Sequence, residues 1–250
     1  MAAFASKSRR STLLVTLAAV TVAISVFAWW NHVPSDVTER DAKYIRLILS
    51  ENGYGELWGA TAASFDDEIS IIVAVQDAVL AHAPVDVGLL MNKPREPEYL
   101  YEARKGLCYD RSRAIEKTLS LLGFETRHVA IYSTAKTGSA LMSLLTPGTS
   151  SHAVSEVRTR RGWLTIDSNS RWIALTEDDV PLSTGDLAAM TVAGEEPIWT
   201  SHNQSPMDPI FSQSFTHLVG LYSRHGRFYP PYTPMPDVNF GQLLHNLSRV

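Results

Sequence analysis

Residues 105–117 read KGLCYDRSRAIEK and contain the single cysteine of a 250-residue chain. From this cysteine onward, apolar and small residues recur at spacings of 4, 3, 4 and 3, at Cys108, Ser112, Ile115, Leu119 and Leu122. This spacing is typical of one face of a helix, and Gly123 is suited to end that helix. The sequence therefore predicts a helix whose first turn carries the thiol on its inner face.

A cysteine at the start of a helix has a distinctive chemistry. Unpaired backbone N–H groups and the positive end of the helix dipole favour its thiolate form. Gly106 allows a tight turn before the helix and leaves room for a substrate carbonyl to approach the sulfur of Cys108. The alternative is that an isolated cysteine fills the core as a small apolar residue. A lone cysteine cannot form an internal disulfide, which leaves a free thiol, an intermolecular disulfide or a reactive nucleophile.

Two further side chains favour the nucleophile. Residues 152–157 (HAVSEV) and 163–167 (WLTID) are predicted to be two short strands joined by a turn. Such a hairpin brings His152 and Asp167 to the same end. The aspartate can then accept a hydrogen bond from one imidazole nitrogen, which leaves the other nitrogen to take the thiol proton.

These pieces, in this order, resemble the transglutaminase-like superfamily, a papain-related group of cysteine enzymes. The matching segments are 106–108, 121–127, 152–157 and 162–167, within roughly residues 65–175. The resemblance implies an α+β fold in which N-terminal helices pack on an antiparallel sheet. It also implies that Cys108 is the nucleophile, that His152 is the general base and acid, and that Asp167 orients the imidazole.

The sequence departs from the family pattern at two points. The family aspartate is usually followed by proline and a small polar residue, whereas Ser168 and Asn169 follow here. The family's oxyanion donor lies upstream of the cysteine and is often an aromatic or amide side chain. The candidates for this role are Trp58, Gln76, Tyr99 and the backbone N–H of Cys108.

Other charged residues near the cysteine are expected to be structural. Arg111 and Arg113 are expected at the surface or in ion pairs with Glu116 and Glu102. His128 is the rival general base, but its strand offers no acidic partner at a comparable position.

The N-terminus predicts a membrane anchor. Lys7, Arg9 and Arg10 precede residues 12–30, which are 19 residues without a charge. At about 1.5 Å per residue such a helix is roughly 28 Å long, close to the ~30 Å hydrocarbon thickness of a bilayer. The positive-inside rule places the rest of the chain outside the cytoplasm, in the periplasm. The alternatives are a signal peptide cleaved after residues 26–28 (VFA) and a twin-arginine export signal.

Beyond the anchor, we expect one helix over about residues 37–50 and a second that begins at a capping box at residues 64–67 (SFDD). We also expect a loop over residues 84–104 and an insertion over residues 133–150, which contains the apolar patch ALMSLL. The expected segments are a basic terminus (1–11), a transmembrane anchor (12–30), a linker and helix (31–64), a catalytic core (65–180) and a C-terminal extension that wraps the core (181–250).

Charge narrows the range of functions. Residues 31–250 hold 19 basic and 26 acidic residues, a formal net charge of −7. This charge offers no basic surface for binding nucleic acid or anionic lipid.

We expect the reaction to be acyl transfer, most simply hydrolysis of a peptide, protein or envelope amide, without a cofactor or metal. The alternatives are a catalytically silent peptide- or glycan-binding module and a zinc site made of Cys108, His152 and Asp167, although no Cys-x-x-Cys or His-Glu-x-x-His spacing is present.

Overall fold

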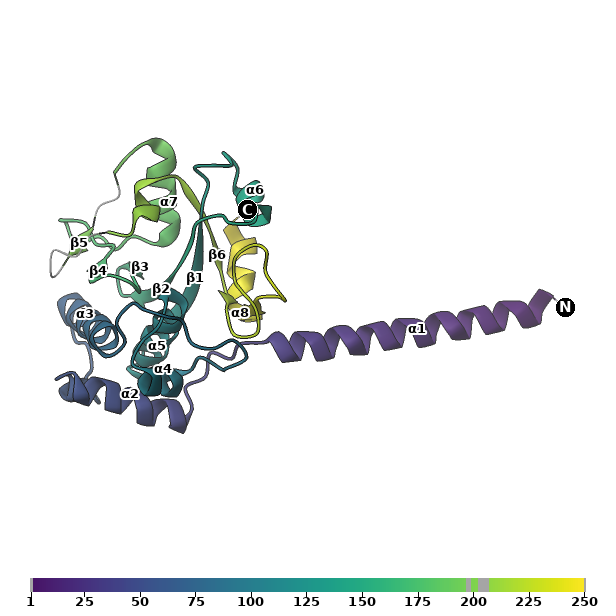
Figure 1. The fold of residues 1–250 in the computed structure, drawn as a ribbon, viewed down its shortest axis with the longest axis horizontal. Coiled ribbons are helices and arrows are strands. Elements are labelled where there is room, and N and C mark those ends of the chain that lie inside the picture. Colours follow the sequence, from purple (N-terminus) through teal and green to yellow (C-terminus); the bar gives the residue numbers. More distant parts are fainter. Residues whose placement is uncertain (1, 197–198, 202–206, 250) are drawn as a thin grey trace.

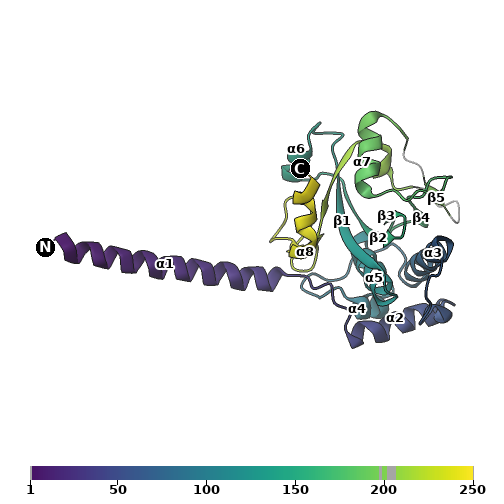
Figure 2. The same ribbon diagram turned by 180° about the vertical axis from the view of Figure 1, so that it is seen from behind.

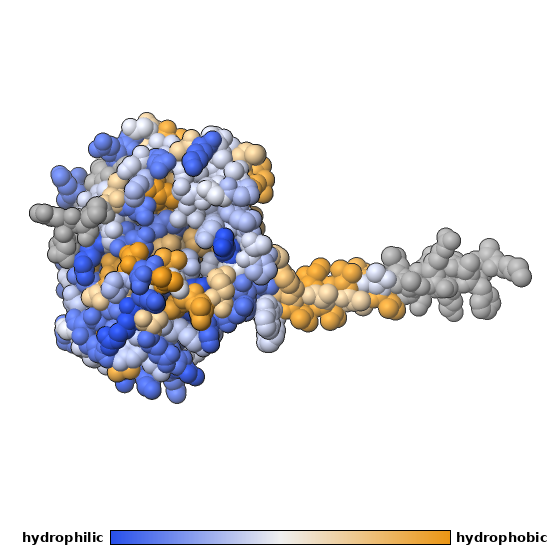
Figure 3. All heavy atoms as spheres, in the orientation of Figure 1, coloured by the Kyte–Doolittle hydropathy of each residue, from blue (hydrophilic) through white to orange (hydrophobic). Residues whose placement is uncertain are grey.

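Helix α1 (Ala2–Asn31) projects from the domain formed by the rest of the chain (Figures 1 and 2). The computed structural model describes residues 2–196, 199–201 and 207–249. Segment Leu14–Asn31 is long and apolar enough to cross a membrane, and its surface is apolar in Figure 3. Its large apolar side chains are 47–77% exposed, so the domain does not cover them.

Four helices form one layer of the domain. Two of them begin at capping boxes, Thr38 with Asp41 and Ser64 with Asp67, and the second of these was predicted from the sequence. Their apolar faces share a core with the inner side of the sheet. The helices are α2 (Glu39–Glu51), α3 (Phe65–His82), α4 (Pro97–Ala103) and α5 (Cys108–Leu121).

Helix α4 corrects the expectation of a continuous loop over residues 84–104. Pro97 occupies its first turn, where the missing N–H costs nothing, and Arg104 ends it in the left-handed conformation with φ of 50°. A helix of seven residues makes about two turns, which is too short for apolar periodicity to emerge. The short 3₁₀ helix η1 (Gly55–Leu57) lies between α2 and α3.

The second layer is a six-stranded antiparallel sheet with the order β5-β4-β3-β2-β1-β6. The predicted hairpin is present, because Ser155 of β2 lies opposite Ile166 of β3. On its other side, β2 pairs with β1, where His152 lies opposite Ile131. Helix α5 packs against β1 and β2, which brings the start of α5 near the end of the hairpin. The strands are β1 (Glu125–Ser133), β2 (Ser151–Thr159), β3 (Gly162–Ile166), β4 (Trp172–Ile173), β5 (Thr200–Ser201) and β6 (Phe215–Val219).

The C-terminal segment does more than wrap the core, because β6 pairs with β1 and so completes the sheet. Residues 229–236 contain neither helix nor strand, as their prolines predicted. The apolar patch ALMSLL forms a short helix, α6, between β1 and β2. The remaining elements are α6 (Ala140–Leu145), α7 (Thr184–Ala193), η2 (Pro209–Ser212), the paired strands β7 (Leu221–Tyr222) and β8 (Asp237–Val238), α8 (Phe240–Leu243) and η3 (Leu244–Arg249).

Candidate active site

Cys108 is the first residue of α5, as the sequence predicted. The start of this helix is held by Asp110, which accepts a hydrogen bond from the backbone N–H of Leu107 at 3.0 Å and forms a buried ion pair with Arg95. A Cβ at Gly106 would lie 2.9 Å from Cδ1 of Leu100, so a larger residue there would force the Leu100 side chain to shift. The half-buried thiol of Cys108 therefore sits at a well-anchored helix N-terminus.

His152 and Asp167 meet at the end of the hairpin. Nε2 of His152 lies 2.6 Å from Oδ1 of Asp167, and both side chains are buried. The backbone N–H groups of Ser168 and Asn169 donate to Oδ1 at 2.7 and 3.2 Å, and that of Ser170 donates to Oδ2 at 3.0 Å. This turn holds the carboxylate in place, and the carboxylate in turn orients the imidazole.

Electrostatics favour a protonated imidazole. Burial alone would lower the pKa of His152, but the negative charge and hydrogen bond of Asp167, and a hydrogen bond with Cys108, raise that pKa well above its ordinary value. Because Asp167 occupies Nε2, Nδ1 is the nitrogen available to the thiol. The structure thus brings together the three side chains singled out from the sequence.

Arg111 is fully buried, which corrects the expectation of a surface charge. Its guanidinium donates to the carbonyl oxygens of Ser168 at 2.5 Å and Gly106 at 3.1 Å, and to Oδ1 of Asn169. Arg111 therefore ties the start of α5 to the turn after Asp167. The spacing already carried this signal, because a residue three positions after Cys108 lies on the same helix face.

Asn169 is a site residue that the sequence reasoning did not identify. Arg111 can only donate hydrogen bonds, so it fixes the amide oxygen of Asn169 and turns Nδ2 toward the histidine. Nδ2 lies 3.4 Å from Nδ1 of His152 and 3.4 Å from Oδ2 of Asp208. Both contacts are long, so this N–H group is weakly engaged beside the histidine nitrogen that faces the thiol. The departure from the family pattern after the aspartate was the available signal.

The four candidate oxyanion donors lie in different environments. Nε2 of buried Gln76 donates to the carbonyl oxygens of Asp167 and Trp172, each at 2.8 Å, so Gln76 holds the turn instead of facing a substrate. The ring of Trp58 is covered by the guanidinium of Arg46, whose Cζ lies 3.5 Å from the ring centre. Tyr99 belongs to α4 and lines a surface hollow with Arg40 and Lys117, residues of α2 and the later part of α5. The backbone N–H of Cys108 lies in the first turn of α5, where helix N–H groups lack intrahelical partners.

The rival histidine has a different environment. His128 is fully buried, and its Nδ1 lies 2.6 Å from Oε1 of Glu116. This acidic partner belongs to α5 and not to the strand of His128, so the sequence of the strand did not indicate it.

Arg113 is also buried, which corrects the expectation of a surface position. It pairs with Glu96 at 2.9 Å instead of Glu116 or Glu102.

An open cavity of about 570 Å³ lies next to Phe211, and its lining does not include Cys108, His152 or Asp167. Phe211 forms part of its wall and meets the His152 ring edge to face, with ring centres 5.9 Å apart. Trp199 and Met207 also line the cavity, which is linked to the imidazole through Phe211. Within residues 2–196, 199–201 and 207–249, no group of three or more His, Cys, Asp or Glu is arranged to hold a metal ion.

Comparison with known proteins places this geometry in a family context. The family model described as transglutaminase-like superfamily matches residues 59–168, which include Cys108, His152 and Asp167. No curated protein matches the chain. The chain is similar to a solved structure from Cytophaga hutchinsonii that is provisionally described as a cysteine protease, with 14% identity, a TM-score of 0.37, and coverage of 73% of this chain and 48% of that one. The chain thus spans about half the length of that protein.

Proposed function

With residues 59–168 belonging to the transglutaminase-like superfamily, we propose that the chain is a cysteine acyl-transfer enzyme that hydrolyses peptide or amide bonds outside the cytoplasm. The observation that carries this proposal is the 2.6 Å contact between His152 and Asp167, with Cys108, at the start of a helix, close enough to the same imidazole to raise its pKa. This set supplies a nucleophile, a proton carrier and a group that orients the carrier.

The chemistry follows from these positions. The thiolate of Cys108 adds to the substrate carbonyl carbon, and the carbonyl π electrons move to oxygen. The imidazolium of His152 then gives its proton to the leaving amine as the C–N bond breaks, which produces an acyl-enzyme. A water molecule loses a proton to His152, attacks the acyl carbon and releases the thiolate. Asp167 keeps the ring oriented and stabilises its positive charge throughout.

The negative oxygen of the tetrahedral intermediate needs hydrogen-bond donors. The two groups that support this role are the backbone N–H of Cys108 and Nδ2 of Asn169, which Arg111 points toward the histidine. Because these donors are set in place before the substrate arrives, they cost no reorganisation during the reaction. We therefore assign Asn169 to the oxyanion site of the proposed reaction.

Replacement of Asn169 by alanine is expected to lower kcat with p-nitrophenyl acetate about 100-fold, with KM little changed, because one donor to the oxyanion is lost. Alkylation of Cys108 by iodoacetamide forms no oxyanion, so its rate should stay at the wild-type value. Stopped-flow absorbance and mass spectrometry measure the two rates. An equal fall in both rates would mean that Asn169 positions the thiol or histidine and donates nothing to the oxyanion.

Water is the simplest acceptor for the acyl group. Cys108 is only half-buried, so water can reach an acyl group carried on its sulfur. For the location, support comes from Leu14–Asn31, which is long and apolar enough to span a membrane, and from the basic residues that precede it. We place the catalytic domain on the periplasmic side of a single span.

The alternative function is a catalytically silent module that binds peptide or glycan in the cavity next to Phe211. Its support is the aromatic lining by Trp199 and Phe211, which suits binding without chemistry. Iodoacetamide distinguishes the two functions. For the enzyme, we expect native Cys108 to be alkylated rapidly at pH 7 and His152→Ala to slow the reaction, because the thiolate loses its cationic partner. Alkylation only after unfolding in guanidinium would favour the silent module.

A further inference from the structure

The segment that leaves α1 is bound to the domain over its whole length, so α1 does not end in a flexible tether. The backbone N–H of Val33 donates to the carbonyl of Val238 at 3.0 Å, and the side chain of Asn239 donates to the carbonyl of Val33 at 2.8 Å. Arg224 donates to the carbonyl of Trp30, the penultimate residue of α1, at 2.9 Å. These bonds join the end of α1 to the C-terminal part of the domain.

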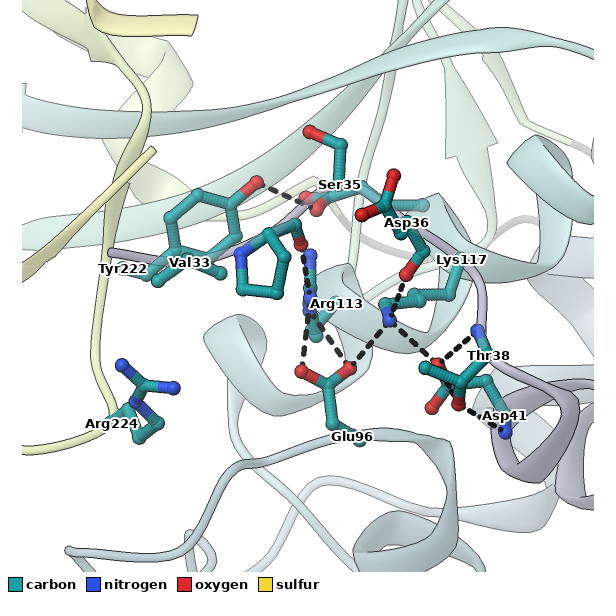
Figure 4. A network of polar contacts seen from close by, with 12 residues as sticks. Val33, Ser35, Asp36, Thr38, Asp41, Glu96, Arg113, Lys117, Tyr222 and Arg224 are labelled. Carbon is teal, nitrogen blue, oxygen red and sulfur yellow. Dashed lines mark hydrogen bonds and ion pairs between the residues drawn. The ribbon is translucent and has the colours of Figure 1, made fainter. Parts of the chain in front are cut away.

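The same segment is also bound to the helix that carries Cys108 (Figure 4). Arg113 donates to the carbonyl of Pro34 at 2.8 Å, and Nζ of Lys117 donates to the carbonyl of Asp36 at 2.5 Å. Lys117 also pairs with Asp41 at 2.7 Å. Both cationic side chains are at most 5% exposed, so water does not compete for these contacts. The orientation of the domain relative to the end of α1 is therefore set by several hydrogen bonds and an ion pair.

An exposed apolar surface lies on the side of the domain from which α1 leaves. Figures 1 and 2 both place α6 and α8 on this side, and Figure 3 shows apolar surface over α6. In α6, Leu141 and Leu145 are 66% and 62% exposed, and in the C-terminal turns Leu244 and Leu247 are 63% and 71% exposed. We name the following residues the α6–α8 apolar face: Leu141, Met142, Leu145, Phe240, Leu244 and Leu247.

These side chains are held outward by the inner sides of their own helices. Leu144 of α6 and Leu243 of α8 pack into the core cluster that contains Tyr132. The side chain of Asn246 exchanges two hydrogen bonds, each of 2.9 Å, with the backbone of Val219 in β6. The α6–α8 apolar face therefore cannot turn inward without the loss of core packing and of a strand-edge anchor.

Lipid is the occupant that fits this surface best. Trp29 and Trp30, 77% and 58% exposed at the domain end of α1, are typical of residues at a membrane interface. Helices α6 and α8, which carry this face, lie on the side of the domain from which α1 leaves (Figure 1). Residues 31–250 carry a net charge of −7, which disfavours electrostatic adsorption and leaves apolar contact as the attraction. An exposed apolar surface next to an anchor of this kind is typical of membrane contact.

We propose that the α6–α8 apolar face rests in the interfacial layer of the bilayer that α1 crosses, so that the catalytic domain is held against the membrane in one orientation. This inference rests on the proposed anchor and adds a second, independent contact with lipid. Its consequence is that the substrate must reach the site close to the membrane surface.

Site-specific labels test the contact in the full chain. In a Cys108→Ala background reconstituted into phosphatidylcholine nanodiscs, a single cysteine labelled with the fluorophore NBD is placed at Leu141 or Leu247. Val192, 73% exposed on α7, serves as the control on another side of the domain, and Val20 in α1 reports insertion of the anchor. We expect lipids with a nitroxide near the headgroup to quench the labels at positions 141 and 247, and not the label at 192. Lipids with a nitroxide on the acyl chain should quench the label at position 20.

Two results would overturn the proposal in different ways. Quenching at position 20 without quenching at 141 and 247 would show an anchored domain that stands clear of the bilayer. A blue-shifted but unquenched label at 141 or 247 would show that protein, such as a second copy of the chain, covers the face. Absence of quenching at position 20 as well would overturn the membrane anchor itself, and with it this inference.

Discussion

Replacement of Cys108 by alanine is expected to reduce the turnover of p-nitrophenyl acetate by about 10⁴-fold or more. The carbon–sulfur bond of the acyl-enzyme cannot form without the sulfur, and the remaining groups of the site cannot replace a nucleophile. Wild-type protein quenched with acid during turnover should carry an acetyl group on Cys108, visible as a mass increase. The alanine variant should carry none.

The Cys108→Ala variant is expected to fold like the wild type, so a loss of activity can be assigned to the missing sulfur. Cys108 is half-buried at the first position of α5, where alanine is well tolerated and removes little volume. Circular dichroism and the thermal midpoint should therefore match those of the wild type. If the folded alanine variant and the wild type gave the same products from p-nitrophenyl acetate and from peptide and glycan mixtures, the proposed enzyme activity would be wrong.

Local signals in the sequence were enough to predict the elements that carry the three site residues. The spacing after Cys108 depends only on the helical repeat, and the strands that hold His152 and Asp167 flank a short turn. The α+β class was also predictable, because helices precede strands along the chain, and it is confirmed. Each of these inferences uses contacts between residues close in sequence.

Contacts between distant residues could not be predicted in this way. Gln76 supports the turn that follows Asp167, 91 residues later in the chain. Arg111 was assigned to the surface because charged residues are seldom buried, yet three polar partners compensate its burial. The pairing of β6 with β1 joins segments separated by the poorly periodic part of the chain. In all three cases the partner becomes apparent only when the chain is folded.

Replacement of Asp167 by asparagine should lower activity near pH 8 by about 10³- to 10⁴-fold and move its alkaline limit to lower pH. In the wild type, the pKa of His152 is raised because Asp167 outweighs the effect of burial. The stabilisation from this pair is fully present below the ordinary histidine pKa of about 6.5 and is lost as the pH rises through the raised value. Without the carboxylate charge, burial dominates, so the imidazolium loses its proton at a lower pH.

Asp208 provides the matched control for this variant. Its Oδ2 lies 4.0 Å from Nδ1 of His152, but its side chain is 24% exposed, and Asp167 and Cys108 account for the raised pKa of the histidine. The change Asp208→Asn should therefore leave the alkaline limit near its wild-type position. Profiles of kcat against pH, with NMR titration of the His152 ring, measure both variants. If Asp208→Asn shifted the limit as far as Asp167→Asn does, general loss of negative charge would explain the effect, and Asp167 would have no special role in holding the proton on His152.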